Sequence, residues 1–378
     1  MKVIQVVPRA FSNANGVSVC VQSMCYGLHG AGVKVSLHAL DTPPDAVFPF
    51  ETVGYNRSVF PCRAIGRSQE MFRGLQNACK DADIIHTNGL WMMPTIYPEW
   101  ARRGTCCKFV VQPHGALAAW SLRRSQLKKL LFGTAFQNRA LSKADMWVAT
   151  SQEEAQDIRH LGYRQPIAVL PNGVDIPVEI NGGRADRRRM FFLSRIHPKK
   201  NVAMLLRCWA RLVNRFPDWD LVIVGPDKDN PYADEMKMLS KSLSCKRVTF
   251  AGELKGKEKY KFMAASECEV LPTFSENFGM VIAESLACGT PVICSRGAPW
   301  EGLVKEHCGW WIPIDEKALE ETMCKVMVLS REELLRMGEN GKIWMKREFE
   351  WPAISSKMKS AYEWLITGQA KPEFVYTE

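Results

Sequence analysis

Residues Thr273 to Ile293 read TFSENFGMVIAESLACGTPVI, and this stretch decides how the second half of the chain folds. Glu276 and Glu284 stand eight residues apart in it, separated by an Asn-Phe-Gly turn and a short apolar run. We read the stretch as a loop, a helix that begins near Asn277, a turn and a short strand. The first N–H groups of a helix lack partners within the helix and attract anions. Two carboxylates beside such a site predict a ligand that carries both hydroxyl and phosphate groups, as a nucleotide sugar does.

Strand-like and helix-like segments alternate along the whole chain. In the first half, strands are predicted near residues 2–7, 33–37, 83–86, 108–112, 146–150 and 167–170. In the second half, they are predicted near 190–194, 220–224, 247–250, 268–271 and 291–294. Short apolar strands separated by helices are typical of parallel sheets that are covered on both faces. Because 378 residues are too many for one core, we expect two doubly wound, Rossmann-like α/β domains.

The turn PNGVD, at residues 171–175, and the polar, basic segment after it mark the predicted domain boundary. This gives an N-terminal domain at 1–175 and a C-terminal domain at 176–350. Residues 351–378 are predicted to form a helix and tail that cross back to the N-terminal domain. Ligands of doubly wound sheets bind at the carboxyl ends of the strands. We therefore expect the two domains to face each other across a ligand-binding cleft.

The composition is ordinary for a globular protein, with 46% hydrophobic and 24% charged residues. No stretch of about 18 apolar residues occurs, so we expect no membrane-spanning helix. The first residues, MKVIQVV, read as a buried strand and not as a secretory signal. Thirteen cysteines without a CxxC pair disfavour a disulfide framework or a zinc site and fit a reducing cytoplasm. The net charge of +10 admits nucleic acid, an anionic membrane or a phosphorylated small molecule as partner, although basic clusters are most often solvated faces.

The segment SRIHPKKN, at residues 194–201, follows the first predicted strand of the second domain. Arg195 comes directly after that strand and Lys200 opens the next helix, so both side chains can converge on one anion at the strand's carboxyl end. A guanidinium fork together with an ammonium group suits a diphosphate. The same residues would otherwise be ordinary surface charges, but their place at the first strand-to-helix turn favours the diphosphate.

Taken together, SRIHPKKN and SENFGMVIAESLACGTPVI resemble the family 4 glycosyltransferases, which have the GT-B fold of two facing Rossmann-like domains. In that family an Arg and a Lys hold the donor diphosphate, and two glutamates eight residues apart follow. PNGVD resembles the interdomain hinge of the family, and PHG at residues 113–115 resembles its N-domain histidine turn. Residues 16–37, GVSVCVQSMCYGLHGAGVKVSL, look like its N-terminal glycine loop and helix. The resemblance covers nearly the whole chain.

The resemblance implies a role for each matching residue. Arg195 and Lys200 would hold the donor diphosphate, and Glu284 would accept hydrogen bonds from the ribose hydroxyls. Glu276 would lie beside the donor sugar, which His114 would approach from the N-terminal domain. The remaining donor contacts would come from Gly16 and from the backbone amides of Asn277, Phe278 and Gly279.

Several of these residues also have a structural reading. Glu276 could serve the dipole of the following helix, His114 could be a hydrogen-bonded structural histidine, and Gly16 could be an ordinary turn glycine. The sequence departs from the family at Asn15, where a second glycine is common, and at Asn88, in a neighbourhood where a second histidine is common. Both departures concern the acceptor side.

Hydrolysis and metal-dependent transfer are both disfavoured. Eight residues along one helix separate two side chains by about 12 Å, whereas the paired carboxyl groups of glycosidases stand roughly 5–5.5 or 6.5–9.5 Å apart. Asp227 and Asp229 form a DxD sequence, which holds a metal in another glycosyltransferase fold. The family that this chain resembles needs no metal there, so we expect neither a metal nor another cofactor.

Residues Trp120 to Phe132 combine a basic face with Trp, Leu and Phe. That profile is typical of a segment that lies on an anionic lipid surface. A packed helix with a solvated basic face is the alternative, and the sequence leaves both open.

The resemblance implies a retaining enzyme of the group 1 type that moves a hexose from a UDP- or GDP-sugar to a glycan or lipid-linked acceptor. Such enzymes act in bacterial polysaccharide or lipopolysaccharide assembly, in the cytoplasm or at the inner face of the membrane, and we expect no nucleic-acid partner. The alternatives are a nucleotide-sugar epimerase or phosphorylase on the same fold, and a non-catalytic basic module that binds membrane or nucleic acid. The sugar, the base, the acceptor and the oligomeric state are not specified by the sequence.

Overall fold

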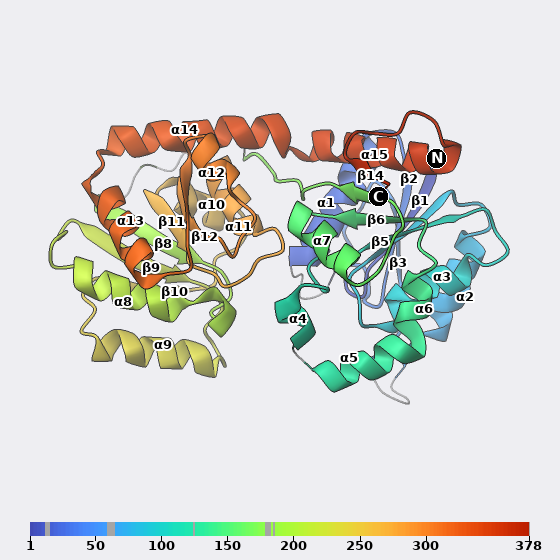
Figure 1. Ribbon diagram of the computed structural model, residues 1–378, viewed down its shortest axis with the longest axis horizontal. Helices are drawn as coiled ribbons and strands as arrows, with labels where there is room; N and C mark the ends of the chain where they lie inside the picture. Colours follow the sequence, from blue (N-terminus) through green and yellow to red (C-terminus); the bar gives the residue numbers. More distant parts are fainter. Residues whose placement is uncertain (12–15, 59–64, 124, 178–182, 184–185, 378) are drawn as a thin grey trace. The chain divides into compact units, whose positions relative to one another are not determined.

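The computed structural model describes residues 1–11, 16–58, 65–123, 125–177, 183 and 186–377. Asn15, Arg124 and residues 184–185 of the basic segment lie outside these described residues. Internal contacts divide the chain into two compact units, which are drawn in Figure 1. Unit 1 comprises Met1–Gly173 with Trp351–Glu378, and unit 2 comprises Val174–Glu350. The units therefore divide at 173/174 and 350/351, where the sequence analysis places boundaries after 175 and 350.

Unit 1 contains an eight-stranded sheet in the order β14-β7-β6-β5-β4-β1-β2-β3. Its strands are β1 (Lys2–Val6), β2 (Lys34–Ala39), β3 (Glu51–Gly54), β4 (Ile84–Asn88), β5 (Lys108–Gln112), β6 (Met146–Ala149), β7 (Ile167–Val169) and β14 (Val375–Tyr376). β14 pairs antiparallel with β7, and the other pairings in this sheet are parallel. The strand order reverses between β1 and β4, and such a switch point is where doubly wound sheets bind ligands.

Helices cover both faces of this sheet. They are α1 (Gly16–Gly30), α2 (Gln69–Ala78), α3 (Tyr97–Ala101), α4 (Ala119–Arg123), α5 (Gln126–Phe132), α6 (Asn138–Leu141), α7 (Gln152–His160) and α15 (Trp351–Thr367). A short 3₁₀ turn at Met93–Thr95 and a π-helical turn at Gly133–Gln137 complete them. Phe109 and Val111 of β5 belong to one apolar cluster and Val110 to another, because successive side chains of a strand point to opposite faces.

The C-terminal helix α15 packs against α1, although the two are far apart in the sequence. A Cβ atom at Gly27 would lie only 1.9 Å from Ser355 Oγ, so a glycine at this position lets the two helices approach closely. Tyr362 of α15 is fully buried in the unit 1 core. Residues at the end of the chain are therefore part of the first unit's interior.

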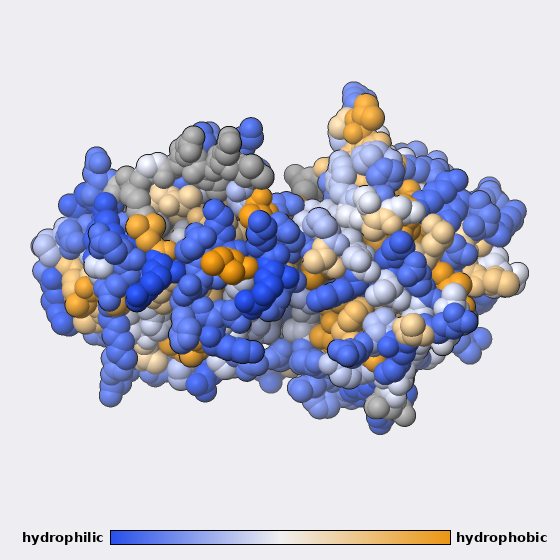
Figure 2. Space-filling view, turned by 90° about the horizontal axis from the view of Figure 1, so that it is seen from above, coloured by the Kyte–Doolittle hydropathy of each residue, from blue (hydrophilic) through white to orange (hydrophobic). Residues whose placement is uncertain are grey.

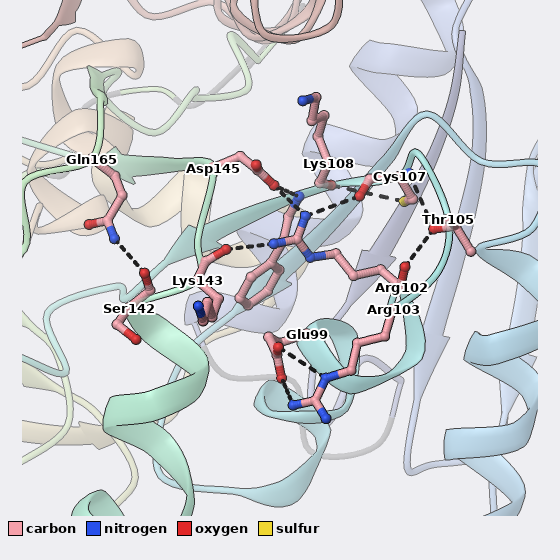
Figure 3. Close-up of polar contacts among 11 residues, drawn as sticks. Glu99, Arg102, Arg103, Thr105, Cys107, Lys108, Ser142, Lys143, Asp145 and Gln165 are labelled. Atoms are coloured by element: carbon pink, nitrogen blue, oxygen red, sulfur yellow. Dashed lines mark hydrogen bonds and ion pairs between the residues drawn. The ribbon is translucent and has the colours of Figure 1, made fainter.

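A polar cluster ties together the amino ends of β5 and β6, as Figure 3 shows. Arg102 Nη1 lies 2.6 Å from Asp145 Oδ2, and the same carboxylate accepts the Phe109 N–H at 2.7 Å. Arg102 also donates to the Lys143 carbonyl. Since ligands bind at the carboxyl ends of the strands, this cluster at the opposite edge stabilises the fold and does not form part of the site.

Unit 2 contains a six-stranded parallel sheet in the order β10-β9-β8-β11-β12-β13. Its strands are β8 (Arg188–Leu193), β9 (Trp219–Val224), β10 (Val248–Gly252), β11 (Cys268–Leu271), β12 (Val292–Ser295) and β13 (Gly309–Ile312). Its helices are α8 (Val202–Leu212), α9 (Pro231–Ser242), α10 (Gly256–Ala264), α11 (Met280–Ala287), α12 (Gly302–Lys305), α13 (Glu316–Val328) and α14 (Arg331–Glu348), with a 3₁₀ turn at Pro198–Lys200. The strand order reverses between β8 and β11, which places the switch point there.

The predicted fold class, two doubly wound parallel α/β sheets, is confirmed, but three strands and one helix start were not predicted correctly. β3, β13 and β14 are only two to four residues long, and sequence periodicity does not resolve such short elements. The helix expected near Asn277 begins at Met280, because Gly279 before it adopts a left-handed backbone with φ 84°. Glu276 therefore precedes the helix that carries Glu284.

No disulfide joins the cysteines that the structure describes, most of which are buried. Within the same described residues, no helix has the length and hydropathy that crossing a bilayer requires. The face shown in Figure 2 is mainly hydrophilic, and its hydrophobic residues lie in separate small areas.

Candidate functional site

Arg195 and Lys200 follow β8 at the switch point of the unit 2 sheet. The backbones at the ends of β8 and β9 approach so closely that a Cβ at Gly225 would lie 2.0 Å from the Ser194 carbonyl oxygen. The Lys200 ammonium forms an ion pair with Glu276, and their side chains are only 11% and 10% exposed. Arg195 is exposed. The two basic residues are thus at the strand end where the sequence predicts them, one buried and one accessible.

Glu276 reaches Lys200 because the loop after β11 is fixed by backbone hydrogen bonds. The Phe274 N–H donates to the Lys199 carbonyl at 2.8 Å, and the Glu276 N–H donates to the Gly297 carbonyl at 2.6 Å. A Cβ at Gly297 would lie 2.4 Å from the Thr273 carbonyl oxygen, so this approach requires glycine. The loop therefore joins the two strand ends that flank the switch point.

The start of α11 lies directly after this loop. Gly279 is its N-cap, and the Phe278 side chain is buried against Trp300 and Phe349, with ring centroids 5.1 and 6.1 Å away. Trp300 Nε1 also donates to the Phe278 carbonyl. Phe278 is therefore a core residue through its side chain, and the backbone of Asn277 to Gly279 is what a ligand could contact. The positive end of the α11 dipole points to that position.

Glu284, in the second turn of α11, forms an ion pair with Lys259 of α10 at 2.7 Å. Burial raises the pKa of Glu284, whereas the charge and hydrogen bond of Lys259 lower it. Sequence reasoning did not single out Lys259, because it stands in a run of lysines at 255–261 and nothing in the spacing shows which of them faces inward.

Positive charge is in excess around Glu276. Burial lowers the pKa of the Lys199 ammonium, the Glu276 carboxylate raises it, and the charges of Lys200 and Arg195 lower it further. The charges of two further cations and one carboxylate therefore act on the Lys199 ammonium. Such a group suits a ligand with more than one negative charge. Lys199 was not among the predicted site residues, although its position beside Lys200 could have indicated it.

Glu269 of β11 lies beneath this group and is fully buried. Burial raises the pKa of Glu269 to about 8, while the Ser285 hydroxyl of α11 lowers it. The charges of Glu284, Lys200 and Glu276 also act on it, so it lies close to both ion pairs. In the sequence, Glu269 stands inside a predicted buried strand, and no spacing marks it as a site residue.

In unit 1, His114 stands in a left-handed turn after β5, with φ 53°, followed by Gly115 with φ 76°. The buried Glu154 carboxylate of α7 fixes this turn, since it accepts the Gly115 N–H through one oxygen and the Thr150 N–H, at 2.7 Å, through the other. His114 Nε2 lies 3.0 Å from Asn88 Oδ1. Burial lowers the pKa of His114 to about 4, so its ring is neutral at pH 7.

Gly16 is the first residue of α1 and is exposed. A Cβ at Gly16 would meet no atom within 4 Å, so no described neighbour requires glycine there. The loop before it, at residues 12–15, lies outside the described residues. Among the predicted site residues, Lys200 and Glu276 contact each other at the switch point of unit 2, and Arg195 follows the same strand end. In unit 1, His114 lies beside Asn88.

One aspartate of the DxD sequence, Asp227, forms an ion pair within unit 2. Asp227 Oδ2 lies 2.7 Å from Lys237 Nζ of α9, and this contact lowers the pKa of Asp227. Asp229 adopts a left-handed backbone, with φ 53°, in the same turn.

Two family models match adjoining parts of the chain. Glycosyltransferase Family 4 matches residues 14–177, and Glycosyl transferases group 1 matches residues 178–344. The chain belongs to the family 4, group 1 glycosyltransferases. This confirms the resemblance on which the sequence analysis relied.

Relatives and solved structures agree with this assignment. The chain is 26% identical over 254 residues to D-inositol 3-phosphate glycosyltransferase from Corynebacterium glutamicum, covering 62% of this chain and 60% of that one. It is 27% identical over 213 residues to phosphatidyl-myo-inositol mannosyltransferase from Mycobacterium tuberculosis, covering 53% and 55%. The chain thus spans less than two thirds of the length of these curated relatives.

The fold of this chain is shared with HepE from Anabaena, whose crystal structure contains UDP and glucose. The two superpose with a TM-score of 0.75 at 16% identity, over 96% of this chain and 99% of HepE. At this identity the likeness shows the fold alone, which is the predicted GT-B fold.

Proposed function

We propose that this chain is a retaining glycosyltransferase that moves a hexose from a UDP- or GDP-sugar to a glycan or lipid-linked acceptor in cell-surface polysaccharide synthesis. The observation that carries the proposal is the excess of positive charge at the unit 2 switch point, where Lys200 pairs with Glu276 and the charges of Arg195, Lys200 and Glu276 all act on Lys199. A nucleoside diphosphate carries the charge that such a group accepts. The UDP in the HepE crystal structure supports this class of donor.

In the proposed reaction, the bond between the sugar's anomeric carbon and the phosphate oxygen breaks, and a bond to an acceptor hydroxyl oxygen forms on the same face. The acceptor proton passes to the departing phosphate. Negative charge grows on that phosphate, and Arg195, Lys200 and the start of α11 would stabilise it. The ion pair with Glu276 holds Lys200 in place before the ligand arrives, so little reorganisation is needed.

The ribose end of the donor would meet Glu284. Its carboxylate lies one helical turn beyond the start of α11 and is oriented by Lys259 at 2.7 Å. A carboxylate accepts hydrogen bonds from two adjacent hydroxyls. Glu276 would lie at the sugar end, so the two glutamates would contact different parts of one long ligand.

A thermal-shift screen with UDP, GDP and ADP tests the donor class. A nucleotide present at a hundred times its dissociation constant should stabilise the protein by about 2.7 kcal/mol. Arg195→Ala should weaken this shift, while Arg73→Ala, an exposed arginine of α2, should leave it unchanged. If no nucleoside diphosphate raises the melting temperature, the proposal is wrong.

Product analysis separates the alternatives on the same fold. Transfer that requires an added acceptor excludes an epimerase, and a sugar phosphate formed from inorganic phosphate would indicate a phosphorylase. A non-catalytic basic module would keep its membrane or nucleic-acid binding, apart from a reduced salt dependence, when Arg195 and Lys200 are both changed to alanine.

We further propose that α4 and α5 lie on an anionic lipid surface, so that the enzyme acts at the cytoplasmic face of a membrane. Within α5, Leu127, Leu130 and Leu131 are 76%, 62% and 69% exposed, and no residue of this helix is buried. Figure 1 shows α5 at the margin of unit 1, away from the sheet. Exposed leucines beside basic residues suit the interface of an anionic bilayer. The Mycobacterium relative, by its name, acts on a phosphatidylinositol.

Sedimentation with phosphatidylglycerol vesicles tests this surface. The protein should bind these vesicles and not phosphatidylcholine vesicles, and the binding should fall in a Leu130→Ser, Leu131→Ser variant. Leu161→Ser is the matched control, because Leu161 is an exposed leucine of the same unit outside α5. Equal binding by the two variants would exclude α5 as the contact.

A further inference from the structure

A chain of hydrogen bonds connects His114 to the C-terminal helix α15. His114 Nε2 lies 3.0 Å from Asn88 Oδ1, and Asn88 Nδ2 lies 2.9 Å from Gln5 Oε1. Gln5 Nε2 lies 3.1 Å from the Tyr362 hydroxyl, which in turn lies 2.6 Å from His86 Nδ1. Gln5, His86, Asn88 and Tyr362 are each at most 2% exposed. These hydrogen bonds join β1, β4 and the turn after β5 to α15.

The direction of this chain is fixed by a backbone carbonyl. Asn88 Nδ2 also lies 3.3 Å from the Val6 carbonyl oxygen, which can only accept a hydrogen bond. The amide nitrogen of Asn88 must therefore face Val6 and Gln5, and its oxygen must face His114. Since an amide oxygen cannot donate, the proton between Asn88 Oδ1 and His114 Nε2 belongs to His114 Nε2.

The donors and acceptors between Gln5 and His86 follow from the orientation of Asn88. Gln5 Oε1 accepts from Asn88, so Gln5 Nε2 donates to the Tyr362 oxygen. The Tyr362 proton then points to His86 Nδ1. His86 consequently carries its own proton on Nε2, a buried atom without a hydrogen-bond partner among the described residues. Apart from the His86 Nε2 proton, each hydrogen bond along the chain joins one donor to one acceptor, and all five side chains are uncharged.

Burial keeps both imidazoles in this neutral form. It lowers the pKa of His86 to about 3 and that of His114 to about 4. With Nε2 protonated, the remaining ring nitrogen of His114, Nδ1, has a lone pair and can only accept.

We propose that Tyr362, Gln5 and Asn88 are positioning residues that preset His114 as a hydrogen-bond acceptor, so that His114 contacts a hydroxyl of the bound sugar and not an oxygen of the phosphates. This inference rests on the proposed function, because a sugar is its ligand. A phosphate oxygen is also an acceptor, so it would be repelled by the Nδ1 lone pair, whereas a sugar hydroxyl can donate to it. The C-terminal helix would thereby act on sugar recognition without touching the sugar.

The first test needs no substrate. Nitrogen NMR of the histidine side chains in the whole protein distinguishes protonated from unprotonated ring nitrogens. His114 and His86 should both show a protonated Nε2 and an unprotonated Nδ1. A protonated Nδ1 on His114 overturns the proposal, even if the protein binds nucleotides and transfers sugar.

The second test removes the Tyr362 hydroxyl. Tyr362→Phe takes away the acceptor of Gln5 and the donor of His86, so the Gln5 amide can reverse. Only the 3.3 Å contact with the Val6 carbonyl then orients Asn88, and the His114 signals should show a mixture of the two tautomers. With the donor that the wild type turns over, kcat/KM should fall about tenfold, the effect of one neutral hydrogen bond. With the monodeoxy donor that lacks the hydroxyl read by His114, the variant and the wild type should differ little.

Tyr55→Phe is the matched control. The Tyr55 hydroxyl lies 2.8 Å from Nδ1 of the buried His38 in the same unit, outside the chain that reaches His114. Both variants should lose similar stability, but only Tyr362→Phe should change the His114 signals and the response to the deoxy donors. If the two variants behave alike in these measurements, Tyr362 has a structural role only and the proposal is wrong. Failure of the nucleotide screen would instead disprove the proposed function and leave the tautomer result standing.

Discussion

The switch points of the two sheets differ in charge, because buried ion pairs lie at that of unit 2 and uncharged hydrogen-bonded side chains lie at that of unit 1. Unit 2 places Lys200 against Glu276 and Lys259 against Glu284, in ion pairs whose side chains are less than 20% exposed. Unit 1 places His114 at the end of an uncharged hydrogen-bond chain. A buried ion pair presents strong charge to a ligand, but the protein loses much stability when one partner is removed. A neutral hydrogen-bond chain instead fixes which atoms donate and which accept, without adding charge.

Burial itself acts in the same sense in both units. It raises the pKa of the Glu269 carboxyl and lowers the pKa of the His86 imidazole, so each group is driven towards its neutral form. What differs is the compensation, because unit 2 supplies counter-charges around its acidic groups and unit 1 supplies hydrogen bonds. The comparison suggests that unit 2 is built for an anion and unit 1 for hydroxyl groups.

The largest effect on turnover should come from breaking the ion pair between Lys200 and Glu276. Lys200→Ala should lower turnover by about 10²–10³-fold, as expected when one stabiliser of a developing negative charge is lost. It should also lower stability, because Glu276 is left buried without its cation. Steady-state kinetics and thermal melting measure the two effects.

A second substitution separates the loss of turnover from the loss of stability. Adding Glu276→Gln to Lys200→Ala removes the uncompensated charge, so stability should recover while turnover stays low. Lys237→Ala is the control, since its ion pair with Asp227 is more exposed than the Lys200–Glu276 pair and should contribute little to stability. Wild-type turnover by Lys200→Ala would contradict the assignment of an anion site to unit 2.

The next effect concerns Glu269 and the pH dependence of stability. Burial raises its pKa from 4.5 to about 8, so between these values the folded protein keeps a proton that the unfolded chain has lost. Stability should therefore fall as pH rises through this window, by about 1.4 kcal/mol for each pH unit. Glu269→Gln should flatten that slope in thermal or urea unfolding, and Glu253→Gln, an exposed glutamate of the same unit, should not. An unchanged slope would show that Glu269 is ionised in the folded protein.

Sequence alone was enough for the parts of the site that depend on local order along the chain. Arg195 and Lys200 were found because they follow an apolar strand, and Glu276 and Glu284 because of their spacing around an Asn-Phe-Gly turn. The structure places these residues where the pattern predicts them, while their roles stay predictions. The helix start was misplaced by three residues, since the left-handed Gly279 excludes the preceding residues from α11.

Partners supplied by tertiary packing could not be predicted. Lys259 pairs with Glu284 only because α10 and α11 lie side by side, and no spacing distinguishes it from neighbouring lysines. Tyr362 stands 276 residues from His86, which it contacts, and it reads as one more aromatic residue on an amphipathic helix. Glu154 likewise reads as a surface residue of α7, although it fixes the turn that carries His114. Each of these contacts is set by how the elements pack, which periodicity does not encode.

The smallest effect should come from His38, and it should have the opposite sign to that of Glu269. Burial lowers the pKa of His38 from 6.5 to about 4, so between these values the unfolded chain binds a proton that the folded protein does not. Stability should be complete above about pH 6.5 and fall as pH decreases towards 4, over a narrower window than that of Glu269. His38→Gln should reduce this acid slope in urea unfolding, while His29→Gln, at an exposed position of α1, should not. Part of the slope should persist in the variant, because burial also lowers the pKa of His86 and His114. An acid slope that survives unchanged in His38→Gln would mean that this histidine is not held neutral. The contrast between neutral buried histidines in unit 1 and buried ion pairs in unit 2 would then be limited to the His114 chain.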